Sequence, residues 1–204
     1  MRTALNMTIG TDRNQYGLVV EQDYDKAVEC YQKGADMGDT GSLYNLGTLY
    51  LFDGGMEQDV GKALEYLQQA IDLGDLSAIN VMGYIYYHGI GVEKDYDKAL
   101  QYFETAAGRG DAYSQGNLGK MYEKGDGVKQ DYDKAVDYYR LSAEQENPDG
   151  LFGLGDCYYF GYGLEKDDQK AAEYYRRALA AGYTPEEEDQ ARLKELLGDE
   201  YQQK

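Results

Sequence analysis

The sequence predicts an all-α protein, an α/α solenoid (superhelix) of about five helix-turn-helix repeats of 36 residues with a C-terminal capping helix. Three registers support this fold class. A Lys-Ala pair recurs every 36 residues, first at 26–27 and last at 170–171. A Leu-Gly or Met-Gly pair recurs with the same period from 46–47 to 154–155, with a Tyr three residues later. Turn glycines follow in phase at Gly55, Gly91, Gly127 and Gly163. Chance does not place three registers in phase over most of a chain.

Each repeat is expected to contain two helices, called A and B here. In the second repeat the apolar positions 78, 79, 82, 85 and 86 follow helical spacing. Helix A is predicted at 40–52, 76–88, 112–124 and 148–160. Helix B is predicted at 24–37, 60–73, 96–109, 132–145 and 168–181.

Residues that favour helix ends stand at the expected boundaries. An aspartate that can cap the free N–H groups precedes each helix B, at Asp23, Asp59, Asp95, Asp131 and Asp167. Glycines suited to a left-handed residue follow helix B at Gly38, Gly74, Gly110 and Gly182. Helix A is then expected to be capped by Asp39, Asp75, Asp111 and, before Pro148, Asn147. We expect Thr184-Pro185, with Glu187 in a capping box, to begin the last helix.

A glycine recurs inside helix A, although one such as Gly83 costs about 1 kcal/mol relative to alanine. Its recurrence predicts a close approach by a neighbouring helix, which we expect to be the Ala-rich helix B. A helix pair of this size cannot bury its apolar stripe alone, so stacking of neighbouring repeats is required.

The repeats define modules of one continuous solenoid domain. The predicted modules are a degenerate N-terminal repeat at 1–38, repeats at 39–74, 75–110, 111–146 and 147–182, and a capping helix with tail at 183–204. Residues 1–22 are interpreted as a decayed helix A and 200–204 as a frayed tail. The capping helix is expected at 185–198, with Leu193, Leu196 and Leu197 turned inward.

Composition and charge limit the kinds of partner. The chain carries 38 acidic and 20 basic residues, a formal charge of −18. Such a chain repels phosphate backbones and anionic membranes, so we expect no nucleic acid and a neutral to basic protein or peptide partner. No stretch approaches the roughly 20 apolar residues of a membrane span, and the first residues lack the apolar segment of a secretory signal. We therefore predict a cytoplasmic monomer without membrane insertion.

The repeat segments LGTLYLFDGG, MGYIYYHGIGVEKDYDKAL, LGKMYEKGDGVKQDYDKAV and LGDCYYFGYGLEKDDQKAA resemble the Sel-1-like repeat family, relatives of tetratricopeptide repeats. The resemblance covers roughly residues 39–182, with weaker cover of 4–38. It implies an α/α superhelix that serves as an adaptor or scaffold, with helix A lining the concave face, and it implies no catalysis. Two departures stand out: Asp53 and Gly54 replace a Gly-x-Gly turn, and Glu146 replaces a C-terminal glycine.

The binding site is predicted from the positions of helix A that vary between repeats, because recurrent positions serve the fold. These positions form an unusually aromatic stripe opposite the core, which suits an interface for an extended peptide or a partner's helix. An alternative is that Tyr87, Tyr159 and Phe160 fill gaps between adjacent A helices. The predicted partner-binding residues are Tyr44, Thr48, Phe52, Asn80, Tyr84, Tyr87, His88, Tyr113, Lys120, Lys124, Phe152, Asp156, Tyr159 and Phe160.

Other chemistry is less well supported. His88 is the one histidine of the chain, and no His/Cys cluster surrounds it, so neither a metal nor a cofactor is expected. Cys30 and Cys157 are interpreted as buried reduced thiols, and their separation by three or more repeats argues against a disulfide between them. The Gly-x-Gly turns lack a preceding strand and are interpreted as connectors rather than phosphate loops.

The sequence thus favours a non-catalytic adaptor that binds a peptide or protein on its helix-A face. One alternative is a structural or assembly module that spaces domains or self-associates through its ends. A hydrolase is a further, less favoured alternative, because the recurrent aspartates are explained as helix caps.

Overall fold

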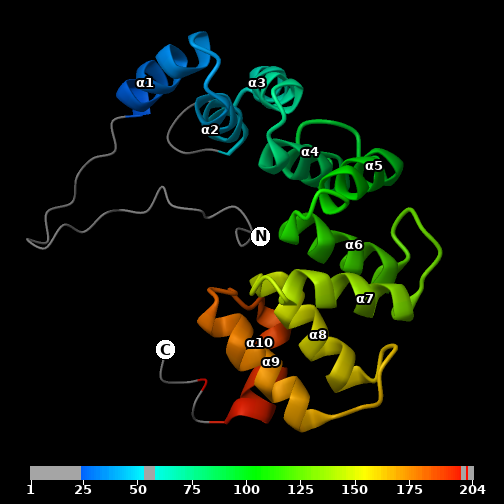
Figure 1. Ribbon diagram of the computed structural model, residues 1–204. Helices are drawn as coiled ribbons and strands as arrows, with labels where there is room; N and C mark the ends of the chain where they lie inside the picture. Colours follow the sequence, from blue (N-terminus) through cyan, green and yellow to red (C-terminus); the bar gives the residue numbers. More distant parts are fainter. Residues whose placement is uncertain (1–23, 53–57, 199–200, 202–204) are drawn as a thin grey trace, which may run out of the picture. The chain divides into compact units, whose positions relative to one another are not determined.

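The computed structural model of the protein describes residues 24–52, 58–198 and 201 (Figure 1). Regular secondary structure in these residues is helical, which confirms the predicted all-α class. The helices are α1 (Tyr24–Asp36), α2 (Thr40–Leu51), α3 (Val60–Asp72), α4 (Leu76–His88), α5 (Tyr96–Ala107), α6 (Ala112–Lys124), α7 (Tyr132–Ala143), α8 (Pro148–Phe160), α9 (Asp168–Ala180) and α10 (Glu187–Leu197). Even-numbered helices α2 to α8 are the predicted A helices, and odd-numbered helices are the B helices. Every described boundary among these lies within two residues of its predicted position.

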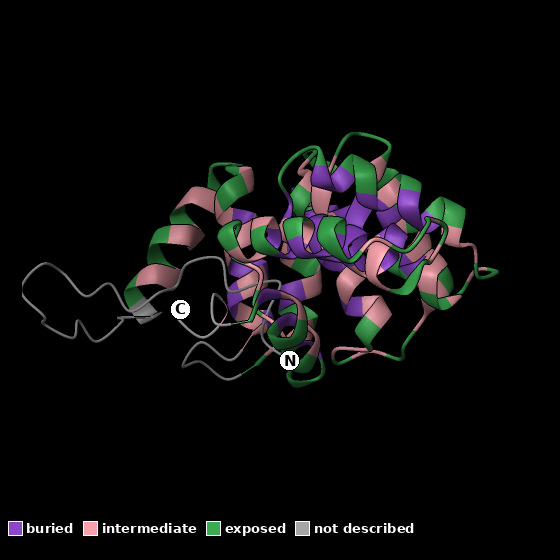
Figure 2. Ribbon diagram, turned by 90° about the horizontal axis from the view of Figure 1, so that it is seen from below, coloured by how far each residue is buried: buried purple, intermediate pink, exposed green. Residues whose placement is uncertain are grey.

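The chain divides into two compact units, Met1–Met82 and Gly83–Lys204, and α4 spans the division. Within the first unit, α1 packs on α2 and α2 on α3. Within the second, α5 to α9 pack in succession, α6 also contacts α8, and α10 packs on α9. Figure 2 shows that buried residues lie on one side of most helices, as expected for stacked amphipathic helices.

Side-chain caps fix the helix starts where the sequence predicts them. Oδ1 of Asp95 accepts a hydrogen bond from the Lys98 backbone N–H at 2.9 Å, and Asp59, Asp131 and Asp167 cap their helices in the same way. Helix A starts are capped by Asp39, Asp75, Asp111 and Asn147. At the ends of helix B, Gly38, Gly74, Gly110 and Gly182 have positive φ. Glu146, which stands at the equivalent position between Gly110 and Gly182, keeps the left-handed conformation with φ 54°.

The recurrent glycine of helix A makes room for a large side chain rather than for alanine. A Cβ placed on Gly83 would lie 2.6 Å from the Phe103 ring. The same clash would occur between Gly119 and Tyr139 at 2.6 Å. The four pairs, each 20 residues apart, are Gly47 with Leu67, Gly83 with Phe103, Gly119 with Tyr139 and Gly155 with Tyr175. The close neighbour is helix B, as expected, and the space that each glycine leaves is filled by a bulky side chain of that helix.

A second recurrent contact explains the Tyr and Asp-x-x-Lys registers. In the second repeat the rings of Tyr86 and Tyr102 stack with centroids 5.9 Å apart, and Nζ of Lys98 lies 4.8 Å from the Tyr86 centroid. Lys98 is also 3.6 Å from the capping carboxylate of Asp95. The stacked pairs are Tyr50–Tyr66, Tyr86–Tyr102, Tyr122–Tyr138 and Tyr158–Tyr174. Each of these four repeats thus joins its two helices through one tyrosine stack and one cation–π contact.

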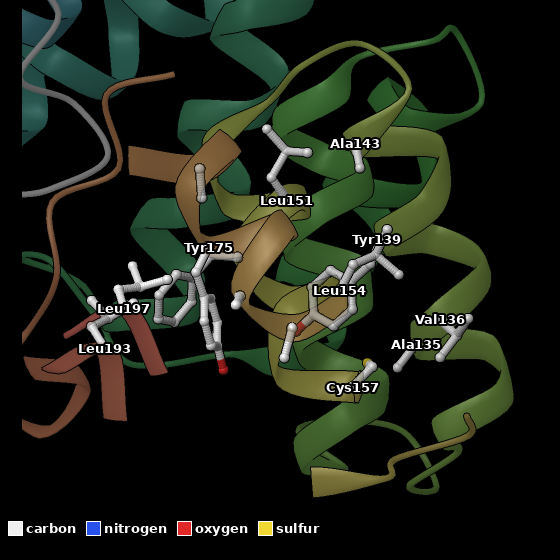
Figure 3. Packing of buried hydrophobic residues seen from close by; sticks show 14 residues of the cluster. Ala135, Val136, Tyr139, Ala143, Leu151, Leu154, Cys157, Tyr175, Leu193 and Leu197 are labelled. Carbon is white, nitrogen blue, oxygen red and sulfur yellow. The ribbon is translucent and has the colours of Figure 1, made fainter. Parts of the chain in front are cut away.

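Helix α10 closes the core of the second unit. Leu193 and Leu197 are buried, and Figure 3 shows both on the α10 side of Tyr175, while Leu196 is half-buried. The helix begins after Glu186, not after the predicted Thr184. Asp189 determines this start, because its Oδ2 accepts the Glu186 backbone N–H at 3.0 Å and the Tyr183 hydroxyl at 3.2 Å.

The outward face of α10 differs from that of a repeating A helix. Counting by the 36-residue period, its exposed residues Glu187, Gln190, Ala191 and Lys194 take the positions of Leu151, Leu154, Gly155 and Tyr158 in α8. In α8 those positions form the seam with helix B. The polar replacements in α10 leave no apolar seam for a further helix B.

Cys157 is buried as predicted, but Cys30 is exposed, so the expectation that both thiols are buried is wrong for Cys30. Cys30 stands where later repeats carry Tyr66, Tyr102 and Tyr138, a half-buried surface position of helix B. The predictions for residues 1–22, for the cap Asp23, for the turn at Asp53, Gly54 and Gly55 and for most of the C-terminal tail lie outside the described residues.

Candidate helix-A face

The predicted site residues of the second unit lie on α4, α6 and α8. Tyr84, Lys120 and Asp156 occupy one position of three successive A helices, and the period places Arg192 of α10 at the same position. His88, Lys124 and Phe160 share a second position one turn later. We call this set of positions the helix-A face.

On α4, three predicted residues form one aromatic cluster. The His88 ring lies 4.2 Å from the Tyr84 ring and 4.9 Å from the Tyr87 ring, measured between centroids. Tyr87 also contacts Tyr96 at 5.3 Å and packs against the core around Phe103. Its hydroxyl donates to Oδ2 of Asp126 at 2.5 Å. Tyr87 therefore has a structural role, which agrees with the alternative of gap filling, whereas the described part of the chain shows no such hydrogen bond for Tyr84.

The surroundings of His88 keep its imidazole neutral at pH 7. Partial burial lowers the pKa of His88 to about 4, and the positive charges of Lys120, Lys94 and Lys124 contribute to this fall. Three ammonium groups therefore act on one ring, although the chain as a whole is strongly acidic.

On α6, Lys120 and Lys124 are both exposed at the helix surface, and Tyr113 is half-buried. Burial raises the pKa of Tyr113, with smaller effects of the charges on Asp149 and Asp111. Burial also raises the pKa of Asp149, and the positive charge of Lys120 partly offsets this. Tyr113, Asp149 and Lys120 therefore lie within electrostatic reach of one another.

On α8, the structure places Phe152 under other side chains and not on an accessible surface. Phe152 is 5% exposed, and its ring stacks on Tyr183 at 3.9 Å. The Arg192 guanidinium lies 5.3 Å from the same ring. The expectation that Phe152 faces a partner is therefore not met, because the segment leading into α10 covers it.

Asp156 is the centre of an ionic cluster with α10. Arg192 Nη2 lies 3.1 Å from Asp156 Oδ1 and 2.6 Å from Asp189 Oδ1, and the Tyr175 hydroxyl donates to Asp156 at 2.6 Å. Burial raises the pKa of Asp156 to about 7, although Arg192 and the Tyr175 hydrogen bond oppose this rise. Asp156 is thus engaged by the chain itself.

The remaining α8 residues border this cluster. The Tyr159 hydroxyl donates to Glu195 at 3.1 Å, and the Phe160 ring meets Tyr159 edge-on at 4.8 Å. Arg192 lies 5.3 Å from the Phe160 centroid, yet Phe160 remains 45% exposed. Phe160 is therefore the α8 residue most available to a partner.

In the first unit, the predicted residues Tyr44, Thr48, Phe52 and Asn80 are all half-buried. Thr48 Oγ1 donates to the Asn45 carbonyl at 3.0 Å, which satisfies its hydroxyl locally. Leu51, next to Phe52, is fully buried and belongs to the core.

The sequence prediction missed Arg192, Glu195 and Lys94. The period could have located the first two, because they lie 36 residues after Asp156 and Tyr159. Lys94 lies in the turn after α4, at a position that carries Gln130 and Lys166 in the next two repeats.

The described residues contain no group of three His, Cys, Asp or Glu side chains arranged to hold a metal ion. Within the same part of the chain, no helix has the length and apolar character needed to cross a bilayer.

Comparison with known proteins identifies the repeats. The profile of the Sel1 repeat matches residues 9–39, 41–75, 76–111, 112–147 and 148–183. A comparison with the curated proteins found no significant match.

Two solved structures are similar over most of the chain. The crystal structure of a Sel1 repeat protein from Oxalobacter formigenes is 31% identical with a TM-score of 0.73, covering 90% of this chain and 70% of that one. The structure of c5321, a protective antigen of uropathogenic Escherichia coli, is 31% identical with a TM-score of 0.69, covering 92% of this chain but 40% of that one. Sel1 repeats are in general protein-interaction modules. With five matched repeats, the protein described here is a member of the Sel1 repeat family.

Proposed function

We propose that this protein is a non-catalytic adaptor or scaffold that binds a peptide or a partner protein on the helix-A face of its second unit. One observation carries the proposal. Residues that recur between repeats form the tyrosine stacks and the close glycine contacts between helices A and B. The side chains of α4 and α6 that do not recur remain accessible to a partner. A surface that varies on a constant scaffold is suited to recognition.

The chemistry of the accessible residues supports an interface. Tyr84 is of a residue type enriched in binding hot spots, and the exposed residues His88, Lys120 and Lys124 add polar and charged groups around it. Their backbone is held by caps at both helix starts, so little conformational entropy is lost when a partner binds.

Partner capture tests the proposal. Immobilised wild-type protein and the Tyr84→Ala variant would be exposed to lysate of the native host, and a captured protein would then be purified for titration. We expect Tyr84→Ala to weaken its binding by about tenfold or more while helicity in circular dichroism is unchanged. Tyr174→Ala, which removes a tyrosine of helix B that stacks on α8 and not on α4 or α6, is the matched control and should retain binding. Equal affinity for wild type and Tyr84→Ala would move the site away from this face.

The proposal includes a monomeric protein in the cytoplasm. The polar outward face of α10 supports the monomer, because self-association through that end would bury Glu187, Gln190 and Lys194 without apolar contact. Sedimentation across a wide concentration range tests this point. A mass that rises with concentration would favour the assembly module instead.

A further inference from the structure

Six residues of α4, α6 and the turn after α4 form what we call the lysine–aromatic face: Tyr84, Tyr87, His88, Lys94, Lys120 and Lys124. Aromatic contacts connect Tyr84, Tyr87, His88 and, through Tyr96, Lys94, while the charges of Lys120 and Lys124 act on the His88 ring. Tyr84 and Tyr87 both contact His88, Tyr87 contacts Tyr96, and Nζ of Lys94 lies 5.4 Å from the Tyr96 centroid. On α6, Lys120 and Lys124 are separated by one helical turn and so share a side of the helix.

The lysines of this face have no ionic partners among the described residues, and three nearby carboxylates are partly buried. None of Lys94, Lys120 and Lys124 forms an ion pair with a carboxylate of the described residues. The neighbouring carboxylates Glu123, Asp126 and Asp149 are half-buried.

Two of these carboxylates already have hydrogen-bond donors. Asp126 accepts the Tyr87 hydroxyl at 2.5 Å, and Glu123 accepts the Tyr139 hydroxyl at 2.8 Å. Burial raises the pKa of the third, Asp149. On α6 the exposed charged groups of this patch are therefore its two lysines. Two exposed carboxylates lie at its edge: Glu93, next to Lys94 in the turn, and Glu186, whose charge acts on Tyr84.

The local positive charge matters despite the chain's net charge of −18. At physiological ionic strength the Debye length is about 8 Å, so distant acidic residues are screened while the nearest charges dominate a docked group. The net charge predicts a neutral to basic partner for the surface as a whole, but it does not predict which charge of partner this patch prefers.

We propose that the lysine–aromatic face binds an acidic peptide segment, with its carboxylates against Lys94, Lys120 and Lys124 and an apolar side chain on the Tyr84 ring. This inference rests on the proposed function and specifies the partner class at the same face. It replaces the neutral to basic partner with a segment whose acidic residues alternate with apolar ones.

His88 provides a direct reporter, because it is the chain's single histidine. Its imidazole gives one set of NMR signals, and the three lysine charges help to hold its pKa low. A bound carboxylate would counter those charges and favour the imidazolium form, so the pKa of His88 should rise on binding.

The test uses the full chain and a short synthetic peptide, blocked at both ends, in which Glu alternates with Leu and Gly. Two matched peptides replace every Glu by Gln or by Lys. In about 0.15 M salt we expect the Glu peptide to bind about tenfold more tightly than the Gln peptide and to raise the pKa of His88. The Lys peptide should bind more weakly than either.

Two charge-removing variants locate the effect. Lys120→Gln and Lys124→Gln should each weaken binding of the Glu peptide about threefold and raise the pKa of His88 in the free protein. Lys129→Gln, a lysine that does not act on His88, should change neither quantity.

Several results would overturn the inference: no saturable binding of the Glu peptide, equal or tighter binding of the Gln or Lys peptide, or unchanged affinity in both lysine variants. Tighter binding of the Gln or Lys peptide that is lost in Tyr84→Ala would overturn the acidic partner but support the proposed function. The proposed function itself would be contradicted if the captured partner bound the wild type and Tyr84→Ala with equal affinity.

Discussion

Two parts of the helix-A face use equivalent positions in opposite ways. At the α8 end, Asp156 faces Arg192 of α10, and Arg192 also covers Phe152, so the face is filled by the chain's own side chains. Toward α4 and α6, the equivalent positions are Tyr84 and Lys120, and the lysine has no ionic partner among the described residues. One scaffold therefore supplies a closed end and an open end, and the identity of one residue per repeat decides which.

The largest effect should follow from opening the closed end. Arg192→Ala leaves the carboxylates of Asp156 and Asp189 without their cation, and Arg192 is 14% exposed. We expect a loss of about 3 kcal/mol in the free energy of unfolding at pH 8, measured by denaturant titration. Lys120→Ala, at the equivalent position of the open end, should cost less than about 0.5 kcal/mol. Similar losses for the two variants would remove the distinction between the ends.

The recurrent glycines of α4 and α8 should be equally sensitive to substitution by a large residue. In Gly83→Leu and Gly155→Leu the new side chain meets the rings of Phe103 and Tyr175, which would lie 2.6 and 2.5 Å from a Cβ atom added to the respective glycine. Each substitution should lower stability by about 1–3 kcal/mol through overpacking, with a lower melting temperature. An unchanged melting temperature for Gly83→Leu would contradict the seam, and Gly41→Ala, where a Cβ meets only Asp39 Oδ2 at 3.6 Å, is the control.

A pH profile separates the closed end from the rest of the molecule. The pKa of Asp156 is about 7 in the folded protein, above its unfolded value, so the folded chain holds a proton there that the unfolded chain releases. The resulting stabilisation is present at low pH and is lost as pH rises from about 4 to 7.

Asp156→Asn should abolish this loss, because the amide cannot ionise but can still accept the Tyr175 hydroxyl. Subtracting the unfolding free energies of the variant from those of the wild type at each pH removes the contribution of the other acids. A difference that does not vary between pH 4 and 7 would show that Asp156 titrates normally.

The smallest effect should distinguish the two tyrosines of the open end. Tyr87→Phe removes the hydroxyl that donates to Asp126 and should cost about 1 kcal/mol. Tyr84→Phe removes a hydroxyl for which the described part of the chain shows no hydrogen bond, and it should change stability by less than about 0.5 kcal/mol. Thermal unfolding of both variants measures the difference. A larger loss of stability for Tyr84→Phe than for Tyr87→Phe would contradict the structural role assigned to Tyr87.

The helices could be predicted closely because each boundary has its own chemical signal. Asp95 before α5 and Gly110 after it are local features, and their meaning does not depend on distant residues. The start of α10 differs from its prediction because its determinant is not local: Asp189 is fixed by Arg192 and Tyr183 as well as by the Glu186 N–H.

The site was harder to predict because variation between repeats has two causes. Phe152 varies because Tyr183 and Arg192 need a ring to pack on, whereas Lys120 varies without any such partner among the described residues. Sequence variation alone does not separate these cases. Contacts between the side chains of successive repeats separate them, and these contacts are visible only in a three-dimensional structure. The partner-binding residues of α4 and α6 remain a proposal.

The polar outer side of α10 also constrains how such an array can be lengthened. A new 36-residue cassette joined after α10 would meet Glu187, Gln190 and Lys194 where it needs leucine and tyrosine. A cassette inserted before residue 184 would instead pack against the aromatic and aliphatic residues of the preceding repeat. Helix α10 would then remain the last helix of the array. Growth by internal duplication would thus preserve the Arg192 closure, and the number of open recognition positions would increase by one helix at each step.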